Sequence, residues 1–206
     1  MPPQSSLVHQ IKEEARRLGF DAVGIARLST PLSSISLLAA QDPILSEASP
    51  ITLRLWGRLK KWLELGFHGT MEWMLRNPKR RSDPSEVLPG CQSLIVVGMN
   101  YYTDQTPDES KNGGRIARYA WGTDYHTLMK ERLNHLENFL HSRVPDIQTR
   151  SYVDTGPIME KAWAQEAGIG WIGKHTNVVS TDFGSWLLLG EILTTVALDF
   201  DEPAMD

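Results

Sequence analysis

The chain contains one cysteine, Cys91, among its 206 residues, and this limits what can hold the fold together. One cysteine cannot form an internal disulfide, a cysteine-rich zinc site or an iron–sulfur cluster held by this chain alone. The fold must therefore rest on an apolar core, and 206 residues with 41% apolar content are enough to bury one. We expect a single domain, or at most two small ones.

The distribution of apolar residues argues against a membrane protein. No apolar run approaches the ~18 residues that a membrane-spanning helix needs. Residues 1–20 carry acidic charges and an amphipathic pattern instead of the apolar stretch of a signal peptide. We therefore expect a cytoplasmic protein with no membrane partner.

Charge is distributed unevenly along the chain, although the net charge is only −4. Residues 54–81 hold eight basic and two acidic side chains, whereas residues 175–206 hold six acids and no Lys or Arg. The basic segment also contains Trp56, Trp62, Phe67 and Trp73. Cations interleaved with aromatic rings can bind a nucleic acid through phosphate contacts and stacking. An amphipathic helix with a solvated basic face explains the same charges and is favoured on charge alone.

The periodicity of apolar residues predicts a mixture of helices and strands without strict alternation. Helical spacing covers 7–18, 55–65, 71–75, 125–144 and 157–167, and residues 83–86 have the pattern of a helix start. Short apolar or β-branched runs predict strands over 20–26, 94–99 and 147–153, and a hairpin that pairs 176–180 with 185–189. The fold class is therefore α+β or mixed α/β. Residues 28–50, rich in Ser, Pro and small residues, are predicted to form a surface loop or weak helix.

Two motifs match nucleotide-binding patterns but stand in the wrong context. Residues 168–173 fit G-x-G-x-x-G, yet a helix is predicted before them and a β-like run after them, the reverse of a dinucleotide site. Residues 168–174 also fit most of a phosphate-binding loop, but His175 stands where the magnesium-binding hydroxyl belongs. We reject both interpretations.

Polar and glycine-rich segments stand at four predicted element boundaries, where functional groups are usually displayed. They are residues 118–126, 153–161, 170–177 and 184–186.

Local sequence leaves the roles of the polar side chains in these segments open. Asp124 is either a helix N-cap or a general acid, the second if a hydrophobic cofactor removes water from it and raises its pKa. His126 and His175 have no metal-ligand spacing, which favours hydrogen-bonding roles. Glu160 has the position of a first-turn helix acid more than that of a base.

Several segments of the chain resemble the cobalamin-dependent epoxyqueuosine reductases, iron–sulfur enzymes of queuosine tRNA modification that are related to reductive dehalogenases. These segments are IKEEARRLGFDAVGIA, WLELGFHGTMEWM, LPGCQSLIVVGMNYY, RYAWGTDYH, VDTGPIMEKAWAQEAGIGWIGKHTN and GSWLLLGEIL. The resemblance covers nearly the whole chain, and residues 28–50 look like an insertion relative to a shorter connector in the family.

The resemblance implies one cobalamin-binding catalytic domain over residues 1–206, with a mixed α/β, nitroreductase-like fold. It implies reduction of epoxyqueuosine to queuosine in tRNA, with Asp124 as the proton donor. By the same match, the residues around the corrin ring would be Tyr101, Asp124, Asp154, Gly173, Lys174, His175 and Thr176. Trp171 and Trp186 would line the corrin site with apolar side chains.

The chain departs from the family pattern beyond its acidic segment LDFDEPAMD. Family members continue there into a ferredoxin-like region whose eight cysteines hold two [4Fe-4S] clusters, which these 206 residues do not contain. We therefore expect the catalytic part of a truncated or split enzyme, supplied with electrons by a separate iron–sulfur protein or another donor. The alternative is a non-catalytic cobalamin-binding or tRNA-binding fragment.

Overall fold

The computed structural model describes residues 4–28, 50–105 and 114–206 and places its helices on both faces of an antiparallel sheet. The four strands of this sheet lie in the order β1-β2-β6-β3, and a two-stranded sheet, β4-β5, lies apart from it. The strands are β1 Ala22–Arg27, β2 Ser93–Asn100, β3 Thr149–Tyr152, β4 Trp171–Ile172, β5 Val178–Val179 and β6 Leu187–Thr194.

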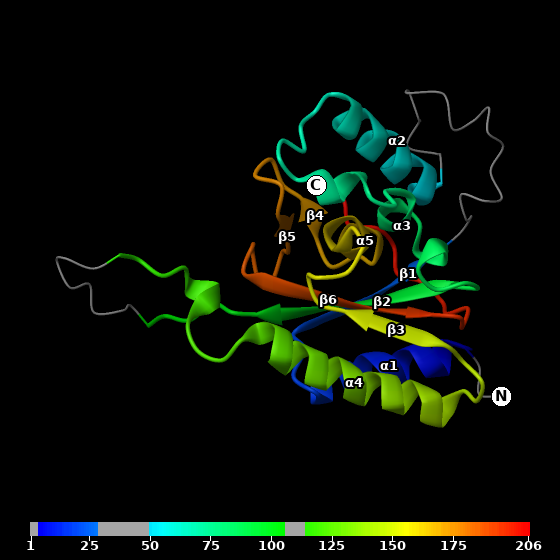
Figure 1. Cartoon of the computed structure of the whole chain (residues 1–206). Helices are drawn as coiled ribbons and strands as arrows, with labels where there is room; N and C mark the ends of the chain where they lie inside the picture. The colour runs from blue at the N-terminus through cyan, green and yellow to red at the C-terminus, as the bar shows by residue number, and fades with distance from the viewer. Residues whose placement is uncertain (1–3, 29–49, 106–113) are drawn as a thin grey trace.

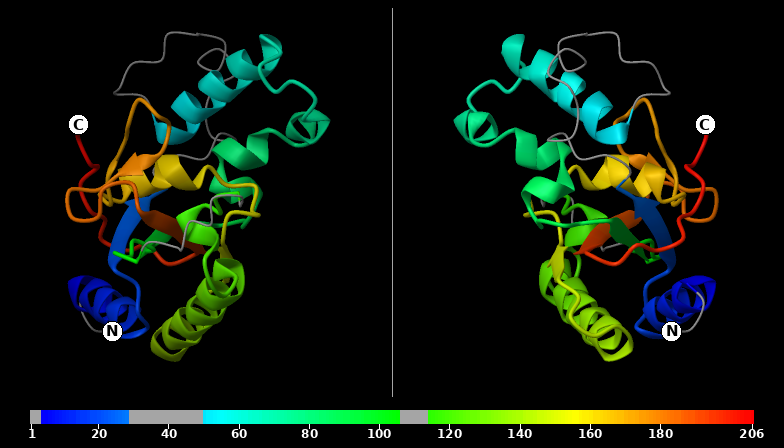
Figure 2. Two further views of the ribbon diagram at one scale, coloured as in Figure 1. Left: turned by 90° about the vertical axis from the view of Figure 1, so that its left-hand side faces the viewer. Right: turned by 90° about the vertical axis from the view of Figure 1, so that its right-hand side faces the viewer.

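Three layers are visible when the molecule is viewed from the side (Figure 2). α1 and α4 cover one face of the four-stranded sheet, and α5 covers the other, with α2 and α3 beyond it (Figure 1). The α-helices are α1 Gln4–Arg17, α2 Ile51–Glu64, α3 Lys79–Ser82, α4 Tyr125–Arg143 and α5 Glu160–Glu166. Short 3-10 helices are η3 Glu72–Leu75, η4 Pro84–Glu86 and η5 Arg118–Ala120.

Alternation along β2 divides the apolar core between the two faces of the sheet. Leu94 and Val96 pack toward α5, whereas Ile95 and Val97 pack toward α1 and α4. All four are fully buried, as expected of a central strand whose successive side chains point to opposite faces. Trp163 of α5 is also fully buried and anchors this helix on the sheet.

Most predicted helices and strands are confirmed, with shifted ends, but the predicted hairpin is wrong. Residues 178–179 pair with β4, and residues 187–194 form β6, which pairs with β2 and β3. One isolated bridge, between Ser180 and Gly184, joins the two halves of the expected hairpin. The apolar run after residue 186 is long enough for a central strand, and pairing on both sides buries more of it than a local hairpin would. The helix start at 83–86 yields only η4.

The inserted loop predicted over 28–50 falls, apart from its two end residues, outside the residues that the structure describes. The rejection of a dinucleotide-binding loop is supported, because α5 precedes residues 168–173 and β4 begins within them.

The basic segment 54–81 contains η3 and most of α2 and α3. Two of its arginines make contacts within the protein. Arg54 pairs with Glu166 of α5 at 3.0 Å, and the Arg81 guanidinium lies 4.8 Å from the centroid of the Trp73 ring. Burial lowers the pKa of Arg81. Large apolar side chains between the helices are exposed: Leu65, Phe67, Met71, Trp73 and Leu75. The segment therefore presents both cations and apolar surface to solvent.

The acidic C-terminal segment lies along β1 and α5. Asp201 accepts a hydrogen bond from the backbone N–H of Ile25 and forms an ion pair with Lys12. The backbone N–H of Ala204 donates to the carbonyl of Gln165 at 2.9 Å. Within the described part of the chain, no helix has the length and apolarity to span a bilayer.

Candidate active site

Asp124 lies at the N-terminus of α4 and caps this helix. Its carboxylate accepts a hydrogen bond from the backbone N–H of His126 at 2.9 Å, which satisfies one of the donors that the first turn leaves unpaired. The chain reaches this position through Gly122, whose φ of +111° is available almost only to glycine. The capping role considered from the sequence is therefore present in the structure.

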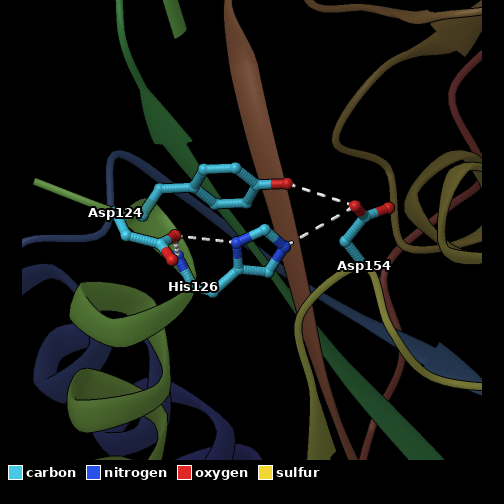
Figure 3. Close-up of polar contacts among 4 residues, drawn as sticks. Asp124, His126 and Asp154 are labelled. Carbon is cyan, nitrogen blue, oxygen red and sulfur yellow. Dashed lines mark hydrogen bonds and ion pairs between the residues drawn. The ribbon is translucent and has the colours of Figure 1, made fainter. Parts of the chain in front are cut away.

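The Asp124 carboxylate also contacts the imidazole of His126. Asp124 Oδ1 lies 2.8 Å from His126 Nδ1, and an ionised carboxylate can only accept, so Nδ1 carries the proton that faces it. The other ring nitrogen, Nε2, lies 3.7 Å from Oδ2 of Asp154 (Figure 3). One imidazole thus joins a carboxylate at the start of α4 to a carboxylate in the loop after β3.

Tyr125 reinforces this connection. Its hydroxyl donates to Asp154 Oδ2 at 3.2 Å, and its ring stacks on that of His126 with centroids 4.0 Å apart. Burial, followed by the negative charge of Asp154, raises the pKa of Tyr125 to about 12. Asp154 has a left-handed φ of 57°, a conformation that Asp tolerates better than most residues. The four side chains form one polar cluster, which we call the Asp124–Asp154 cluster.

The surroundings of Asp124 favour its ionised form. The side chain is 65% exposed, and the hydrogen bonds from the His126 side chain and backbone lower its pKa. A carboxyl with this environment is an acceptor at neutral pH. It becomes a proton donor only when a bound molecule removes the water from around it.

Two hollows lie beside the Asp124–Asp154 cluster. One is about 130 Å³ in volume and is lined by Tyr125, Asp154, Glu160, Lys161, Leu187, Leu188 and Leu189. The other is about 490 Å³ in volume and is lined by His126, Lys130, Ser151, Tyr152, Val153 and Thr155.

Two acids with raised pKa values lie near these hollows. Partial burial raises the pKa of Glu160, in the first turn of α5. Glu191, in the middle of β6, is only 2% exposed, and its Oε2 has no hydrogen-bond partner among the described residues. Burial and the charges of Glu160 and Asp154 raise the pKa of Glu191 to about 8. Glu191 was missed from the sequence; the signal that could have found it is one acid within the apolar run LLLGEILT.

The predicted segment Gly173–Thr176 forms the turn between β4 and β5. The Thr176 N–H donates to the Gly173 carbonyl, and the Gly173 N–H donates to the Asn177 carbonyl, both at 2.9 Å. A Cβ on Gly173 would lie 2.8 Å from the His175 imidazole, so the ring occupies the space that glycine leaves. Lys174 lies in the same turn. Its side chain is exposed and forms no hydrogen bond or ion pair with the residues that the structure describes.

Side-chain contacts connect this turn to both neighbouring regions. His175 Nε2 lies 2.9 Å from the hydroxyl of Ser185, and Lys161, which lines the first hollow, donates to the Asn177 side chain at 2.9 Å. The turn therefore borders the first hollow on one side and the segment before β6 on the other.

Tyr101 lies just beyond β2, against Trp186. The ring centroids are 5.5 Å apart in an edge-to-face arrangement, and the Tyr101 N–H donates to the Trp186 carbonyl. Burial raises the pKa of Tyr101. Across the described residues, His126 joins Asp124 to Asp154, whereas Tyr101 contacts Trp186 and His175 contacts Ser185, with no contact to either carboxylate.

Comparison with known proteins gives the family of the chain. The family model described as "Epoxyqueuosine reductase QueG, DUF1730" matches residues 81–155, which include Tyr101, Asp124 and Asp154. A curated epoxyqueuosine reductase from Prochlorococcus marinus (strain NATL2A) is 43% identical over 198 residues, which cover 96% of this chain and 56% of that protein. The chain belongs to the epoxyqueuosine reductase family.

Another curated relative, from Synechocystis sp. (strain ATCC 27184 / PCC 6803 / Kazusa), is 51% identical over 146 residues, or 71% of this chain and 50% of that protein. The chain spans about half the length of the curated relatives that it matches.

Solved structures of epoxyqueuosine reductases share the fold of this chain. A selenomethionine-labelled structure superposes with a TM-score of 0.79 and 27% identity over 99% of this chain and 49% of that one. A complex with an epoxyqueuosine-modified tRNA-Tyr stem loop gives a TM-score of 0.73 and 28% identity, with the same coverage. A B12-dependent reductive dehalogenase, at 13% identity and a TM-score of 0.56 over 100% of this chain and 21% of that one, shares the fold alone. The mixed α/β class is thus confirmed, and the chain shares its fold with reductive dehalogenases.

Proposed function

We propose that residues 1–206 form one cobalamin-binding catalytic domain that reduces epoxyqueuosine to queuosine in tRNA, in the cytoplasm. The observation that carries this proposal is the Asp124–Asp154 cluster. Its Asp154 carboxylate lines the first hollow together with three leucines of β6, and His126 joins Asp154 to Asp124. The relatives of the chain, named epoxyqueuosine reductases, support the same function. Activity, cofactor and substrate are all part of the proposal.

The first hollow, at about 130 Å³, is too small to hold a whole corrin ring, so we propose that its lining contacts one part of the ring, which is apolar on its faces and carries amide groups at its edge. Leu187, Leu188 and Leu189 are half-buried and offer apolar contact, while Asp154 and Lys161 offer hydrogen bonds. The described residues contain no group of three or more His, Cys, Asp or Glu side chains able to hold a metal ion. Cobalt held by its own macrocycle needs no such group.

We propose that the ring extends beyond this hollow and is also contacted by the other predicted residues, which are Tyr101, Asp124, Gly173, Lys174, His175 and Thr176.

Removal of an epoxide oxygen to leave a carbon–carbon double bond consumes two electrons and two protons and releases water. Bound cobalamin supplies the low-valent cobalt whose electrons break the carbon–oxygen bonds. Asp124 donates a proton to the departing oxygen once the cofactor and substrate have excluded water from its carboxyl. Before this step, His126 holds Asp124 at the start of α4 through the 2.8 Å contact, and Asp154 and Tyr125 hold the imidazole.

A similar solved structure supports movement at this position. It is an epoxyqueuosine reductase from Bacillus subtilis with an aspartate catalytic loop swung out of the active site, at 27% identity and a TM-score of 0.77. We propose that Asp124 likewise leaves its contact with His126 to reach the substrate. A carboxylate at a helix N-terminus, 65% exposed, is free to make such a movement.

The electrons and the RNA come from outside these residues. The chain's one cysteine is buried, so we propose a separate iron–sulfur protein or another electron donor. We propose that the basic segment 54–81 contacts tRNA phosphates. Affinity for tRNA should then fall as salt rises, and charge reversal at Lys79, Arg80 and Arg81 should flatten this dependence. An unchanged salt slope would place the RNA-binding surface elsewhere.

A second candidate function is a non-catalytic cobalamin- or tRNA-binding fragment. The lowered pKa of Asp124 favours it, because an ionised carboxylate donates no proton. The experiment that separates the two combines binding and turnover. Purified chain is mixed with cobalamin, freed of excess by gel filtration and examined for retained corrinoid absorption and a raised melting temperature.

The same preparation is then supplied with a strong chemical reductant and an epoxyqueuosine-containing tRNA. Retained cobalamin and queuosine formation support the enzyme. Retained cobalamin without turnover supports the binding fragment, and the absence of both retained colour and stabilisation contradicts the proposal.

A further inference from the structure

Arg118, at the start of η5, lies among three aromatic rings. Its guanidinium carbon lies 4.9 Å from the ring centroid of Tyr102, 5.3 Å from that of Trp121 and 5.1 Å from that of Trp186. Among the residues that the structure describes, the guanidinium forms no hydrogen bond or ion pair. We call Arg118 and these rings the Arg118 cage. The contacts of the Arg118 guanidinium with the described residues are therefore cation–π contacts with these three rings.

The rings of the cage come from three separate segments and are themselves anchored. The Trp121 indole N–H donates to the Ile116 carbonyl at 2.8 Å. The backbone of Trp186 accepts from Tyr101 at 3.0 Å, and the Tyr102 and Trp186 rings meet edge to face at 5.3 Å. The arrangement is therefore formed before any ligand arrives, which lowers the entropy lost on binding.

Apolar surface remains open to solvent around the cation. Tyr102 is 49% exposed and Trp186 is 39% exposed. Large aromatic side chains rarely stay this open in a cluster without a ligand or partner to cover them. Trp186 follows Ser185, the contact of His175, so the cage continues directly into the β4–β5 turn that carries Lys174. The surface combines flat apolar faces with positive charge.

An arginine surrounded by aromatic rings favours a ligand that has both a phosphate group and a flat ring. The guanidinium N–H groups have no hydrogen-bond partner among the described residues, and their planar fork matches two oxygens of a phosphate. Exposed aromatic faces stack on heterocyclic bases with little preference for which base. A ligand that uses both features carries a phosphate joined to a flat ring.

We propose that the Arg118 cage is a nucleotide phosphodiester site, in which the Arg118 N–H groups donate to the phosphate and the Tyr102 or Trp186 ring stacks on the attached base. This inference rests on the proposed function, which offers two sources of the same chemistry. One is the backbone of the tRNA, and the other is the phosphodiester-linked nucleotide of cobalamin.

Three probes separate these sources: a synthetic RNA hairpin, cobalamin, and cobinamide, which lacks the phosphodiester-linked nucleotide. Their affinities are measured by calorimetry for the wild-type chain, Arg118→Gln, Arg118→Lys and Arg16→Gln. Arg16 is exposed on α1, so its variant removes the same charge away from the cage. Melting curves establish that each variant is folded.

If RNA supplies the phosphate, Arg118→Gln weakens the hairpin roughly tenfold, as expected for loss of a charge-assisted hydrogen bond. If the cofactor supplies it, wild type prefers cobalamin to cobinamide by roughly tenfold, and Arg118→Gln removes this preference. In either case Arg118→Lys is intermediate, because it keeps the charge without the fork, and Arg16→Gln resembles wild type. Should Arg118→Gln fail to fold, Arg118→Lys and competition by inorganic phosphate on wild type give the same comparison.

The inference is overturned if all four proteins bind each probe alike, or if wild type binds neither the hairpin nor cobalamin. It is also overturned if Arg16→Gln loses as much affinity as Arg118→Gln, since charge alone then explains the result. None of these binding measurements requires turnover. A chain that binds through Arg118 but forms no queuosine contradicts the proposed function and leaves the phosphodiester site standing.

Discussion

Asp124 at the start of α4 and Glu191 within β6 are two carboxyl groups that the fold holds in opposite states. Asp124 is 65% exposed and contacts two nitrogen donors of His126, which lower its pKa. Glu191 is 2% exposed, one of its oxygens has no partner, and burial is the main cause that raises its pKa to about 8. At neutral pH the first is an anion and the second mostly holds its proton.

This difference shows that water and hydrogen-bond donors, more than residue type, set the protonation of each acid. Donors that stabilise the charged form lower a carboxyl pKa, and loss of water without such donors raises it. The same rule gives Asp124 its proposed activity. A cofactor that displaces water from Asp124 moves it toward the state in which Glu191 already lies.

The largest expected effect is on turnover when Asp124 is changed. Asp124→Asn keeps a side-chain oxygen for the helix cap but has no acidic proton, so we expect the rate to fall roughly 100- to 10,000-fold with little change in melting temperature. Asp124→Ala should lose the same activity and also melt earlier, because the cap is lost. Single-turnover formation of queuosine and thermal melting measure the two effects.

Asp146→Asn is the matched control, since Asp146 is exposed beyond the other end of α4 and its left-handed φ of 62° suits asparagine. Wild-type turnover by Asp124→Asn, with early melting of Asp124→Ala, would reduce Asp124 to a cap. The proton would then come from water or from Tyr125 or His126.

A smaller effect is expected on stability when the buried acid is made permanently neutral. The pKa of Glu191 is raised on folding, so its contribution to stability is complete below about pH 4.5 and is lost as pH rises toward about 8. Glu191→Gln removes this loss. Its free energy of unfolding relative to wild type should therefore rise by on the order of 2–4 kcal/mol as the pH increases from 5 to 9.

Denaturant unfolding at several pH values measures this gain. Glu13→Gln, on the exposed surface of α1, serves as control and should show no comparable trend. A parallel pH dependence of wild type and Glu191→Gln would mean that Glu191 is ionised within the fold.

The smallest effect is expected in the β4–β5 turn, which has no buried charge to disturb. A Cβ on Gly173 would crowd the His175 ring, so Gly173→Ala should cost about 1–2 kcal/mol and weaken cobalamin binding through movement of His175. Gly114→Ala is the control, because a Cβ at Gly114 has nothing within 4 Å. Unfolding curves and cobalamin titration measure both effects, and unchanged cobalamin affinity in a destabilised Gly173→Ala would remove this turn from the cofactor site.

Local signals in the sequence were enough for most of the fold. The cap at Asp124 and Pro145 mark the two ends of the region that contains α4, and the β-branched apolar run predicts β2. The partner of the strand after residue 186 was not predictable in the same way. Its apolar pattern suits a hairpin and a central strand equally, and only the packing of distant segments decides between them.

The same difference between local and long-range contacts decides which parts of the candidate site could be predicted. Asp124 and His126 are two residues apart, so their contact follows from the start of one helix. The approach of Asp154 to His126 and the burial of Glu191 depend on how β3, α5 and β6 assemble. An acid in an apolar run gives no sign from sequence of whether it faces water or the core, because one step in register exchanges the two faces.

The most direct test of the account is the pKa of Asp124 with and without cobalamin. Carboxyl ¹³C NMR of selectively labelled chain gives this value, with Asp124→Asn assigning the resonance. We predict a pKa below the ordinary aspartate value of about 3.9 for the chain alone and a clear rise when diamagnetic cobalamin is bound. An Asp124 pKa that stays low with cobalamin bound would contradict its role as the proton donor.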